Sequence, residues 1–147
     1  MQAAGRLRAL LAREEIIVAP GAYDAVSALT IQQAGFTAVY MTGSGTAASL
    51  GFPDIGLVTM TEMVENAARI ARSVSIPLIA DADTGYGNEL NVTRTVREYE
   101  ARGVAGLHIE DRHTGARTHL ATQHVVLALG HSARDTFTLL YERGVYM

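Results

Sequence analysis

The sequence predicts an α/β protein built from repeated strand, loop and helix units. Short, near-continuous apolar runs alternate with amphipathic stretches of helical periodicity, and glycine or polar residues mark the junctions. Apolar runs of this kind are typical of parallel strands that crossover helices bury on both faces. At 147 residues and 48% hydrophobic composition, we expect one folding unit.

The elements alternate regularly along the chain. Leu7, Leu10 and Leu11 indicate an N-terminal helix. Four strands are predicted at residues 16–19, 37–41, 76–80 and 105–109, with helices at 24–34, from an N-cap at Thr61 to about 73, and at 89–102. This periodicity fits a doubly wound sheet and a (β/α) barrel, and the lack of a glycine-rich segment after the first strand favours the barrel.

Composition excludes several classes of function. The net charge of -3 gives no basic excess, so we expect neither nucleic acid nor an anionic membrane surface as a partner. The absence of cysteine excludes disulfides, thiolate metal sites and a catalytic thiol, and the absence of lysine excludes Schiff-base chemistry. No continuous apolar stretch follows the N-terminal arginines as in a signal peptide, so a cytoplasmic location is expected.

Polar side chains gather directly after the predicted strands. They are Tyr23 and Asp24, Thr42 and Ser44, Asp81 and Asp83, and Glu110 and Asp111, in strand order. The carboxyl ends of parallel strands form the active-site end of barrels and open α/β sheets, so these residues are candidates for one site. Each could instead be only the N-cap of the following helix, because Asp, Ser and Thr are favoured there.

The carboxylates indicate a hard metal ion. Asp81 and Asp83 stand two positions apart after a buried strand, so they face the same way and repel each other unless a cation lies between them. They suit Mg²⁺, with Mn²⁺ as a substitute, and Glu110 would complete the set. Such an ion can hold a 2-oxo carboxylate and stabilise an enolate, which indicates a lyase, decarboxylase or mutase.

Several motifs together resemble a known superfamily. They are TGSG (42–45), GFPD (51–54), DADTGYGN (81–88), NV (91–92), RTV (94–96) and GLHIED (106–111). In this order they resemble the isocitrate lyase/phosphoenolpyruvate mutase superfamily, and most of all its methylisocitrate lyase, dimethylmalate lyase, oxaloacetate decarboxylase and carboxyphosphonoenolpyruvate mutase members. The resemblance implies a homo-oligomeric (β/α)₈ barrel with Mg²⁺ at the carboxyl ends of its strands. Residues 1–111 would form the first four βα units, and residues 112–147 a divergent tail, with short helices as one interpretation.

The resemblance also implies roles for individual residues. Asp83 would bind the metal directly, and Asp81 and Glu110 would act on it mostly through water. The pocket for the substrate's carboxylate and oxo groups would be lined by Tyr23, Thr42, Gly43, Ser44 and Asp83. Asp54 matches a loop aspartate of the phosphonate-processing branch, and it joins Glu110 as a candidate catalytic residue.

The chain departs from the superfamily after Asp111. The lyases continue there with a gating loop that carries a lysine, arginine, cysteine, glycine motif, whereas this chain reads RHTGAR (112–117). A truncated or frame-shifted product, or an altered splice form, explains the change most simply. The leading hypothesis is therefore a Mg²⁺-dependent carbon–carbon lyase or decarboxylase that is impaired in this chain. Carbon–phosphorus chemistry on phosphonopyruvate-like substrates and a catalytically dead half-barrel are the alternatives.

The missing loop predicts little or no turnover by the 147-residue chain alone. Catalysis through an enolate needs charge stabilisation, a group that moves the proton and a lid that excludes water, and only the first has recognisable residues. Steady-state assays with oxaloacetate, methylisocitrate and dimethylmalate at saturating Mg²⁺ check this. A turnover of about 1 s⁻¹ or more, ordinary for an enzyme, would contradict it.

Overall fold

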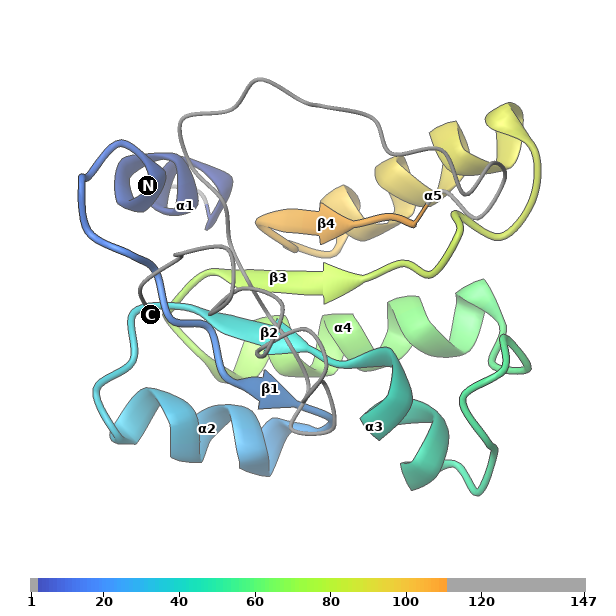
Figure 1. Cartoon of the computed structure of the whole chain (residues 1–147), viewed down its shortest axis with the longest axis horizontal. Helices are drawn as coiled ribbons and strands as arrows, with labels where there is room; N and C mark the ends of the chain where they lie inside the picture. The colour runs from blue at the N-terminus through green and yellow to red at the C-terminus, as the bar shows by residue number, and fades with distance from the viewer. Residues whose placement is uncertain (1–2, 111–147) are drawn as a thin grey trace, which may run out of the picture.

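The computed structural model describes residues 3–110, where strands and helices alternate as predicted (Figure 1). The elements are α1 (Ala3–Leu11), β1 (Gly21–Ala22), α2 (Ala25–Gln33), β2 (Val39–Met41), α3 (Gly43–Ser49), α4 (Met60–Ser73), β3 (Leu78–Asp81), α5 (Glu89–Ala101) and β4 (Gly106–His108). None of the helices in this part of the chain is long and apolar enough to cross a membrane. The predicted tail at residues 112–147 lies outside the described residues.

The four strands form one parallel sheet in the order β1-β2-β3-β4. Gly21 lies opposite Tyr40, Val39 opposite Leu78, and Ile79 opposite Gly106. A doubly wound sheet reverses its strand order at a switch point, whereas a (β/α) barrel adds each new strand on the same side of the last. The unreversed order confirms the preference for the barrel.

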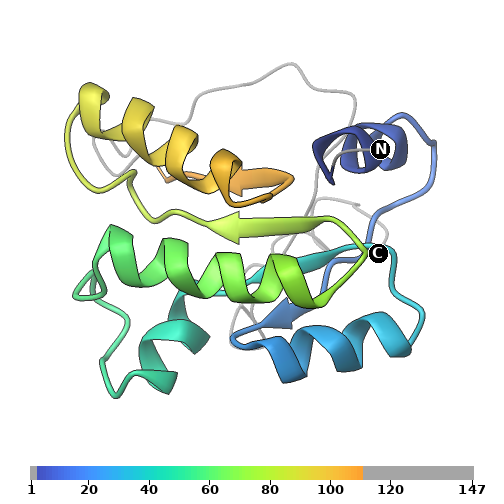
Figure 2. The same ribbon diagram turned by 180° about the vertical axis from the view of Figure 1, so that it is seen from behind.

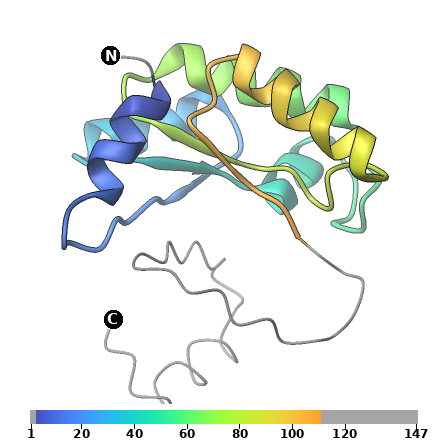
Figure 3. The same ribbon diagram turned by 90° about the horizontal axis from the view of Figure 1, so that it is seen from above.

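Helices α2, α4 and α5 cover one face of the sheet (Figures 2 and 3). The main hydrophobic core lies between these layers, and its largest members are fully buried: Tyr99, Met41, Ile70, Leu78 and Val39. Successive strand side chains point to opposite faces, so Val39 and Met41 enter this core while Tyr40 does not. The strands are thus held chiefly by apolar burial against the helices.

A second, smaller cluster lies on the opposite face, where α1 packs. It consists of Leu7, Ala19, Ala38, Tyr40 and Ile79. Leu7 comes so close to β4 that a Cβ on Gly106 would lie 2.8 Å from its Cδ2 atom. Alternation along β3 places Asp81 on the same face as Ile79, so this face carries the polar chemistry at the carboxyl end of the sheet.

The first strand lies later in the chain than predicted. Residues 16–19 form an extended lead-in, and Ile16 and Val18 are 75% and 57% exposed. Pairing with β2 begins only at Pro20, whose carbonyl accepts the Tyr40 amide at 3.0 Å. The apolar run shows that a chain segment favours extended backbone, but hydrogen bonds to β2 decide where the strand begins.

One helix was not predicted, and the start of another differs from the prediction. The glycine-rich segment after β2 starts α3, with Thr42 as its N-cap. Helix α4 begins after Thr59, two residues before the predicted cap at Thr61. Thr59 and Glu62 form a reciprocal capping box, and the T-x-x-E spacing marks this start in the sequence, whereas Thr61 has no acid three residues later.

The amino end of β3 is fastened to α2 by one side chain. The Gln32 Oε1 atom accepts the amide of Ser75 at 2.6 Å, the Ser75 hydroxyl at 3.0 Å and the Ile76 amide at 3.3 Å. These are backbone and side-chain donors of the turn that follows α4. Gln32 therefore supplies hydrogen bonds that this turn cannot make within a helix or strand.

We expect Asp24→Ala to lower the free energy of unfolding by about 1 kcal/mol at neutral pH, because Asp24 caps α2. Its Oδ1 atom accepts the Ser27 amide at 2.7 Å, and this bond, followed by that of the Ser27 hydroxyl, lowers the pKa of Asp24 below 3.8. Because the pKa of Asp24 is lower in the folded state than in the unfolded state, the ionised carboxylate stabilises the fold at pH values above the unfolded pKa. This stabilisation is lost as the pH falls through the folded pKa.

Urea unfolding between pH 7 and pH 3 checks this prediction, with Asp24→Asn as the control. Asparagine caps a helix about as well as aspartate but does not titrate, so its contribution should not change with pH. An Asp24→Ala penalty that stays constant down to pH 3 would contradict the assignment.

Candidate metal and substrate site

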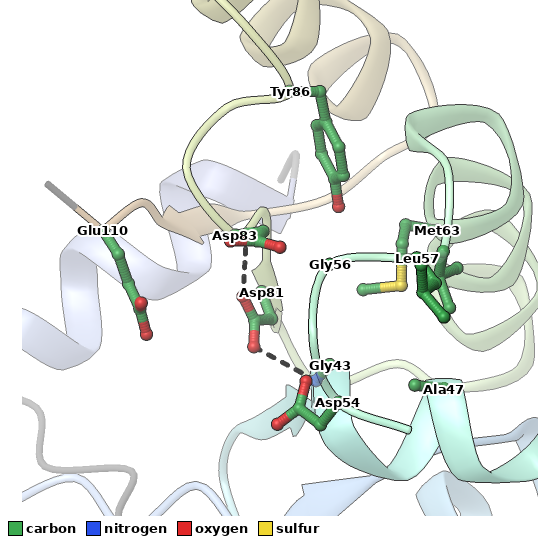
Figure 4. Close-up of a pocket in the computed structure, with 11 residues that line it drawn as sticks. Gly43, Ala47, Asp54, Gly56, Leu57, Met63, Asp81, Asp83, Tyr86 and Glu110 are labelled. Atoms are coloured by element: carbon green, nitrogen blue, oxygen red, sulfur yellow. Dashed lines mark hydrogen bonds between the residues drawn. The ribbon is translucent and has the colours of Figure 1, made fainter. Parts of the chain in front are cut away.

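A cavity of about 100 Å³ opens at the carboxyl ends of β2, β3 and β4. It is lined by Gly43, Ala47, Asp54, Gly56, Leu57, Val58, Met63, Asp81, Asp83, Tyr86 and Glu110 (Figure 4). Four of these residues are acidic, and they come from the α3–α4 loop, from β3 and the loop after it, and from the segment after β4. The structure thus brings together the metal-ligand candidates with Gly43 and Asp54, as the strand order predicts.

The Asp81 carboxylate is fixed by two backbone donors. Its Oδ2 atom accepts the Gly43 amide at 3.1 Å, and its Oδ1 atom accepts the Asp83 amide at 2.9 Å (Figure 4). The hydroxyl of the fully buried Tyr99 donates to the Asp81 main-chain carbonyl at 3.1 Å. Asp81 therefore joins the start of α3 to the loop after β3 and has little freedom to rotate.

Asp83 adopts a left-handed backbone conformation, with φ of 47°. Its amide donates to Asp81, and its carbonyl accepts the Glu110 amide at 2.7 Å. Tyr86, in the same loop, has φ of 61°, and these are the two non-glycine residues with positive φ among residues 3–110. Such conformations cost on the order of 1–3 kcal/mol each and concentrate at functional sites.

A partly buried pair of tyrosine hydroxyls and one threonine hydroxyl support the loop that carries Asp83. The hydroxyls of Tyr86 and Tyr99 lie 3.5 Å apart, and Thr95, fully buried, donates to the Gly85 carbonyl at 3.0 Å. Burial is the main cause that raises the pKa of Tyr86 to about 12; the bond with Tyr99 lowers it, and the carboxylates of Asp81 and Asp83 raise it. Tyr86 therefore stays protonated near neutral pH, as a hydroxyl next to the carboxylates.

Tyr40 and His108 lie on the same face of the sheet, beside Asp81. The Tyr40 hydroxyl is 3.1 Å from His108 Nδ1, and Asp81 and His108 are opposite each other in the register of β3 and β4. Burial first, and then the charge and hydrogen bonding of Asp81, raise the pKa of Tyr40 above its ordinary value. Neither residue was among the candidates from sequence.

Tyr23, Thr42 and Ser44 lie beside the cavity and do not line it. The hydroxyls of Thr42 and Ser44 are 3.0 Å apart at the start of α3. A Cβ on Gly45 would lie 2.8 Å from Thr42 Cγ2 and 3.0 Å from Tyr23 Cβ, so both side chains lie close to Gly45. Of the residues expected to hold the substrate, Gly43 and Asp83 line the cavity. The other three follow the carboxyl ends of β1 and β2 and do not line it.

The carboxylates fit a hydrated magnesium ion better than a closed metal cage. Within residues 3–110, no three Asp, Glu or His side chains are arranged so that together they could hold one ion directly. Mg²⁺ usually keeps several waters and takes only one or two carboxylates from the protein. Asp81, with both oxygens already accepting amides, fits contact through water, and Asp83 and Glu110 border the same cavity.

A comparison with known proteins identifies the family. The model of the phosphoenolpyruvate phosphomutase family matches residues 7–136. The chain belongs to this family. The predicted relationship to the isocitrate lyase/phosphoenolpyruvate mutase superfamily is thus confirmed. The family match extends past residue 111, and the predicted domain boundary there stays a prediction.

Individual relatives are similar to the chain in sequence and in structure. The chain is 56% identical to 2,3-dimethylmalate lyase of Eubacterium barkeri over 113 residues, which cover 76% of the chain and 39% of the relative. It is 48% identical to isocitrate lyase of Haloferax volcanii, over 85% of the chain and 37% of the relative. A crystal structure of phosphonopyruvate hydrolase in complex with oxalate and Mg²⁺ matches with a TM-score of 0.74 and 37% identity, over 80% of the chain and 41% of that protein.

The chain therefore spans less than half the length of these relatives. Its four-stranded sheet corresponds to the first four βα units of the superfamily's barrel, which confirms the predicted fold class. The relatives are lyases and related enzymes, so the chain comes from an enzyme family.

Three residues near the carboxylates were not among the candidates predicted from the sequence: Tyr40, Tyr86 and His108. Tyr40 and His108 could have been found from strand alternation, because both fall on the face of Asp81 near the carboxyl ends of their strands. The left-handed φ of Tyr86 has only a weak signal, which is its position between two glycines.

We expect Gly43→Ala to weaken Mg²⁺-dependent oxalate binding by about 10- to 100-fold, the effect usual for disturbing a partner of a metal ligand. A Cβ at Gly43 would lie 2.6 Å from Asp81 Oδ2, so the carboxylate has to turn away and lose its amide donor. Titration calorimetry with oxalate in the presence and absence of Mg²⁺ measures the change.

The matched control is Gly21→Ala in β1, where the new Cβ would meet nothing closer than 3.6 Å. This variant should bind like the wild type. Equal affinities for the Gly43→Ala and Gly21→Ala variants would show that the position of Asp81 does not matter for the ligand.

Proposed function

We propose that this chain carries the metal-binding part of a Mg²⁺-dependent carbon–carbon lyase or decarboxylase, which acts on a 2-oxo or 2-hydroxy carboxylate through an enolate. The observation that carries the proposal is the group of four carboxylates around one cavity at the carboxyl ends of the strands. Asp83 would hold the ion directly, and Asp81 and Glu110 would bind its water ligands. Mn²⁺ prefers similar oxygen ligands and would substitute.

The ion would supply Lewis-acid stabilisation of the negative charge that develops on the substrate oxygens. The chain's own residues would do the rest of the binding. Gly43 and Asp81 form one rigid wall of the cavity, and the protonated hydroxyl side chain of Tyr86 borders it as well. Tyr23, Thr42 and Ser44 would contact the substrate's carboxylate where it leaves the cavity toward β1 and β2.

Carbon–carbon cleavage is favoured over carbon–phosphorus chemistry by the degree of similarity. Identity is 56% with 2,3-dimethylmalate lyase and 42% with the carboxyvinyl-carboxyphosphonate phosphorylmutase of Arabidopsis thaliana. Asp54, an exposed residue that lines the cavity, is one candidate catalytic residue, and it matches a loop aspartate of the phosphonate-processing branch. Glu110 is the second candidate, since its amide is tied to Asp83 while its side chain borders the cavity.

A homo-oligomer is part of the same proposal. Among residues 3–110, β1 and β4 each pair on one side only, and such edges favour association with further strands. Light scattering, which gives the mass of the assembly, would measure the number of copies.

The proposal predicts that the chain binds oxalate only when Mg²⁺ is present. Oxalate offers the paired oxygens of an enolate, so its binding tests the metal and substrate parts of the cavity together. Asp83→Asn should reduce Mg²⁺ binding below detection, since it removes the charge of the direct ligand while keeping its shape.

Asparagine is a better replacement than alanine at this position. Asp83 has a φ of 47°, where asparagine is tolerated and alanine costs about 1–2 kcal/mol. Glu65→Gln is the control, because it removes one exposed carboxylate on α4 away from the cavity. Oxalate binding that is independent of Mg²⁺, or wild-type Mg²⁺ affinity in Asp83→Asn, would refute the proposal.

A further inference from the structure

Asn66 is a buried amide in the middle of α4, and its side chain reaches both the segment after β1 and helix α3. Asn66 is only 8% exposed, and it does not line the cavity. Its Nδ2 atom donates to the Tyr23 carbonyl at 2.9 Å and to the Thr46 hydroxyl at 3.1 Å. A polar side chain in a hydrophobic layer is costly unless its hydrogen bonds are made, so this placement needs a reason.

The direction of these hydrogen bonds follows from the chemistry of the partners. A carbonyl oxygen can only accept, so the amide NH₂ of Asn66 must face Tyr23. The Thr46 hydroxyl donates its single hydrogen to the Thr42 carbonyl at 2.8 Å, and it must therefore accept from Asn66. The result is a directed chain from Asn66 through Thr46 to the Thr42 carbonyl.

The Thr42 carbonyl belongs to the same peptide unit as the Gly43 amide. At one end, this unit accepts the Thr46 hydroxyl at 2.8 Å and the Thr46 amide at 3.1 Å. At the other end, the Gly43 amide donates to Asp81 Oδ2 at 3.1 Å. A peptide unit is planar, so a rotation that frees its carbonyl also turns its amide away from Asp81.

We propose that Asn66 is a positioning residue of this site: through Thr46 it orients the Thr42–Gly43 peptide and thereby the Asp81 carboxylate, and through Tyr23 it holds the loop after β1. The proposal rests on the proposed function, since it concerns how the same cavity is kept ready for Mg²⁺ and a carboxylate ligand. Asn66 contacts neither the ion nor the ligand in this proposal. It acts from α4, in the helix layer that covers one face of the sheet.

A pair of substitutions at Thr46 tests the chain of hydrogen bonds. Thr46→Val keeps the shape but removes the hydroxyl, whereas Thr46→Ser keeps the hydroxyl and removes a methyl group. Thr46 is 1% exposed, so both variants lose stability. Only Thr46→Val should weaken Mg²⁺-dependent oxalate binding, by about tenfold, and only Thr46→Val should speed hydrogen exchange of the Gly43 amide.

The second test is Asn66→Asp, with the exposed Gln33→Glu as its matched amide-to-carboxylate control. The new carboxylate cannot donate to the Tyr23 carbonyl or to Thr46, so it should reproduce the loss of oxalate affinity and of Gly43 protection. Gln33→Glu should change neither. Each measurement uses the 147-residue chain, with calorimetry for oxalate and NMR-detected exchange for the amide.

The two proposals fail in different ways. If the wild-type chain does not bind oxalate with Mg²⁺, the proposed function is wrong, and Gly43 exchange in Thr46→Val against Thr46→Ser still decides the positioning role. If the wild type binds oxalate but Thr46→Val and Asn66→Asp keep its affinity and Gly43 protection, the positioning role is wrong. Equal effects of Thr46→Val and Thr46→Ser would also overturn it, because they would reflect packing alone.

Discussion

The arrangement at the carboxyl end of the sheet depends on how the Asp81 carboxylate is held. Its two oxygens accept one amide from the start of α3 and one from its own loop after β3. Hydrogen bonds to a charged acceptor are stronger than neutral ones, so these contacts orient a carboxylate that would otherwise be repelled by its acidic neighbours. The absence of a side chain at Gly43 is what allows this approach.

The loop after β3 is strained, and the surrounding structure maintains the strain. Asp83 and Tyr86 both have left-handed backbone conformations, and the loop is tied to α5 by the Thr95 hydroxyl and to the segment after β4 by the Glu110 amide. The Thr95 bond is buried beneath α5, so the site depends on a correctly packed helix layer. The backbone that carries Asp83 is therefore fixed on both sides, and such preorganisation is what electrostatic catalysis requires.

Much of the fold and part of the site could be predicted from sequence. Apolar runs locate β2 to β4, and the spacing of Asp81 and Asp83 by itself indicates one cation site. The start of β1 could not be predicted, because pairing with β2 decides it, and α3 was missed because its glycines suggest a loop while Thr42 caps a helix. The role of Asn66 depends on contacts 43 and 20 residues away in sequence, which no local pattern encodes.

The contacts of Gln32 show that the two ends of the sheet have different roles. Gln32 fastens the turn before β3 at the amino ends of the strands, while the acidic residues gather at the carboxyl ends. Substitutions near Gln32 can therefore change the melting temperature without changing the residues that line the cavity. Such a division lets a lineage acquire new reactions while its scaffold persists, which suits a fold whose relatives include both lyases and phosphonate-processing enzymes.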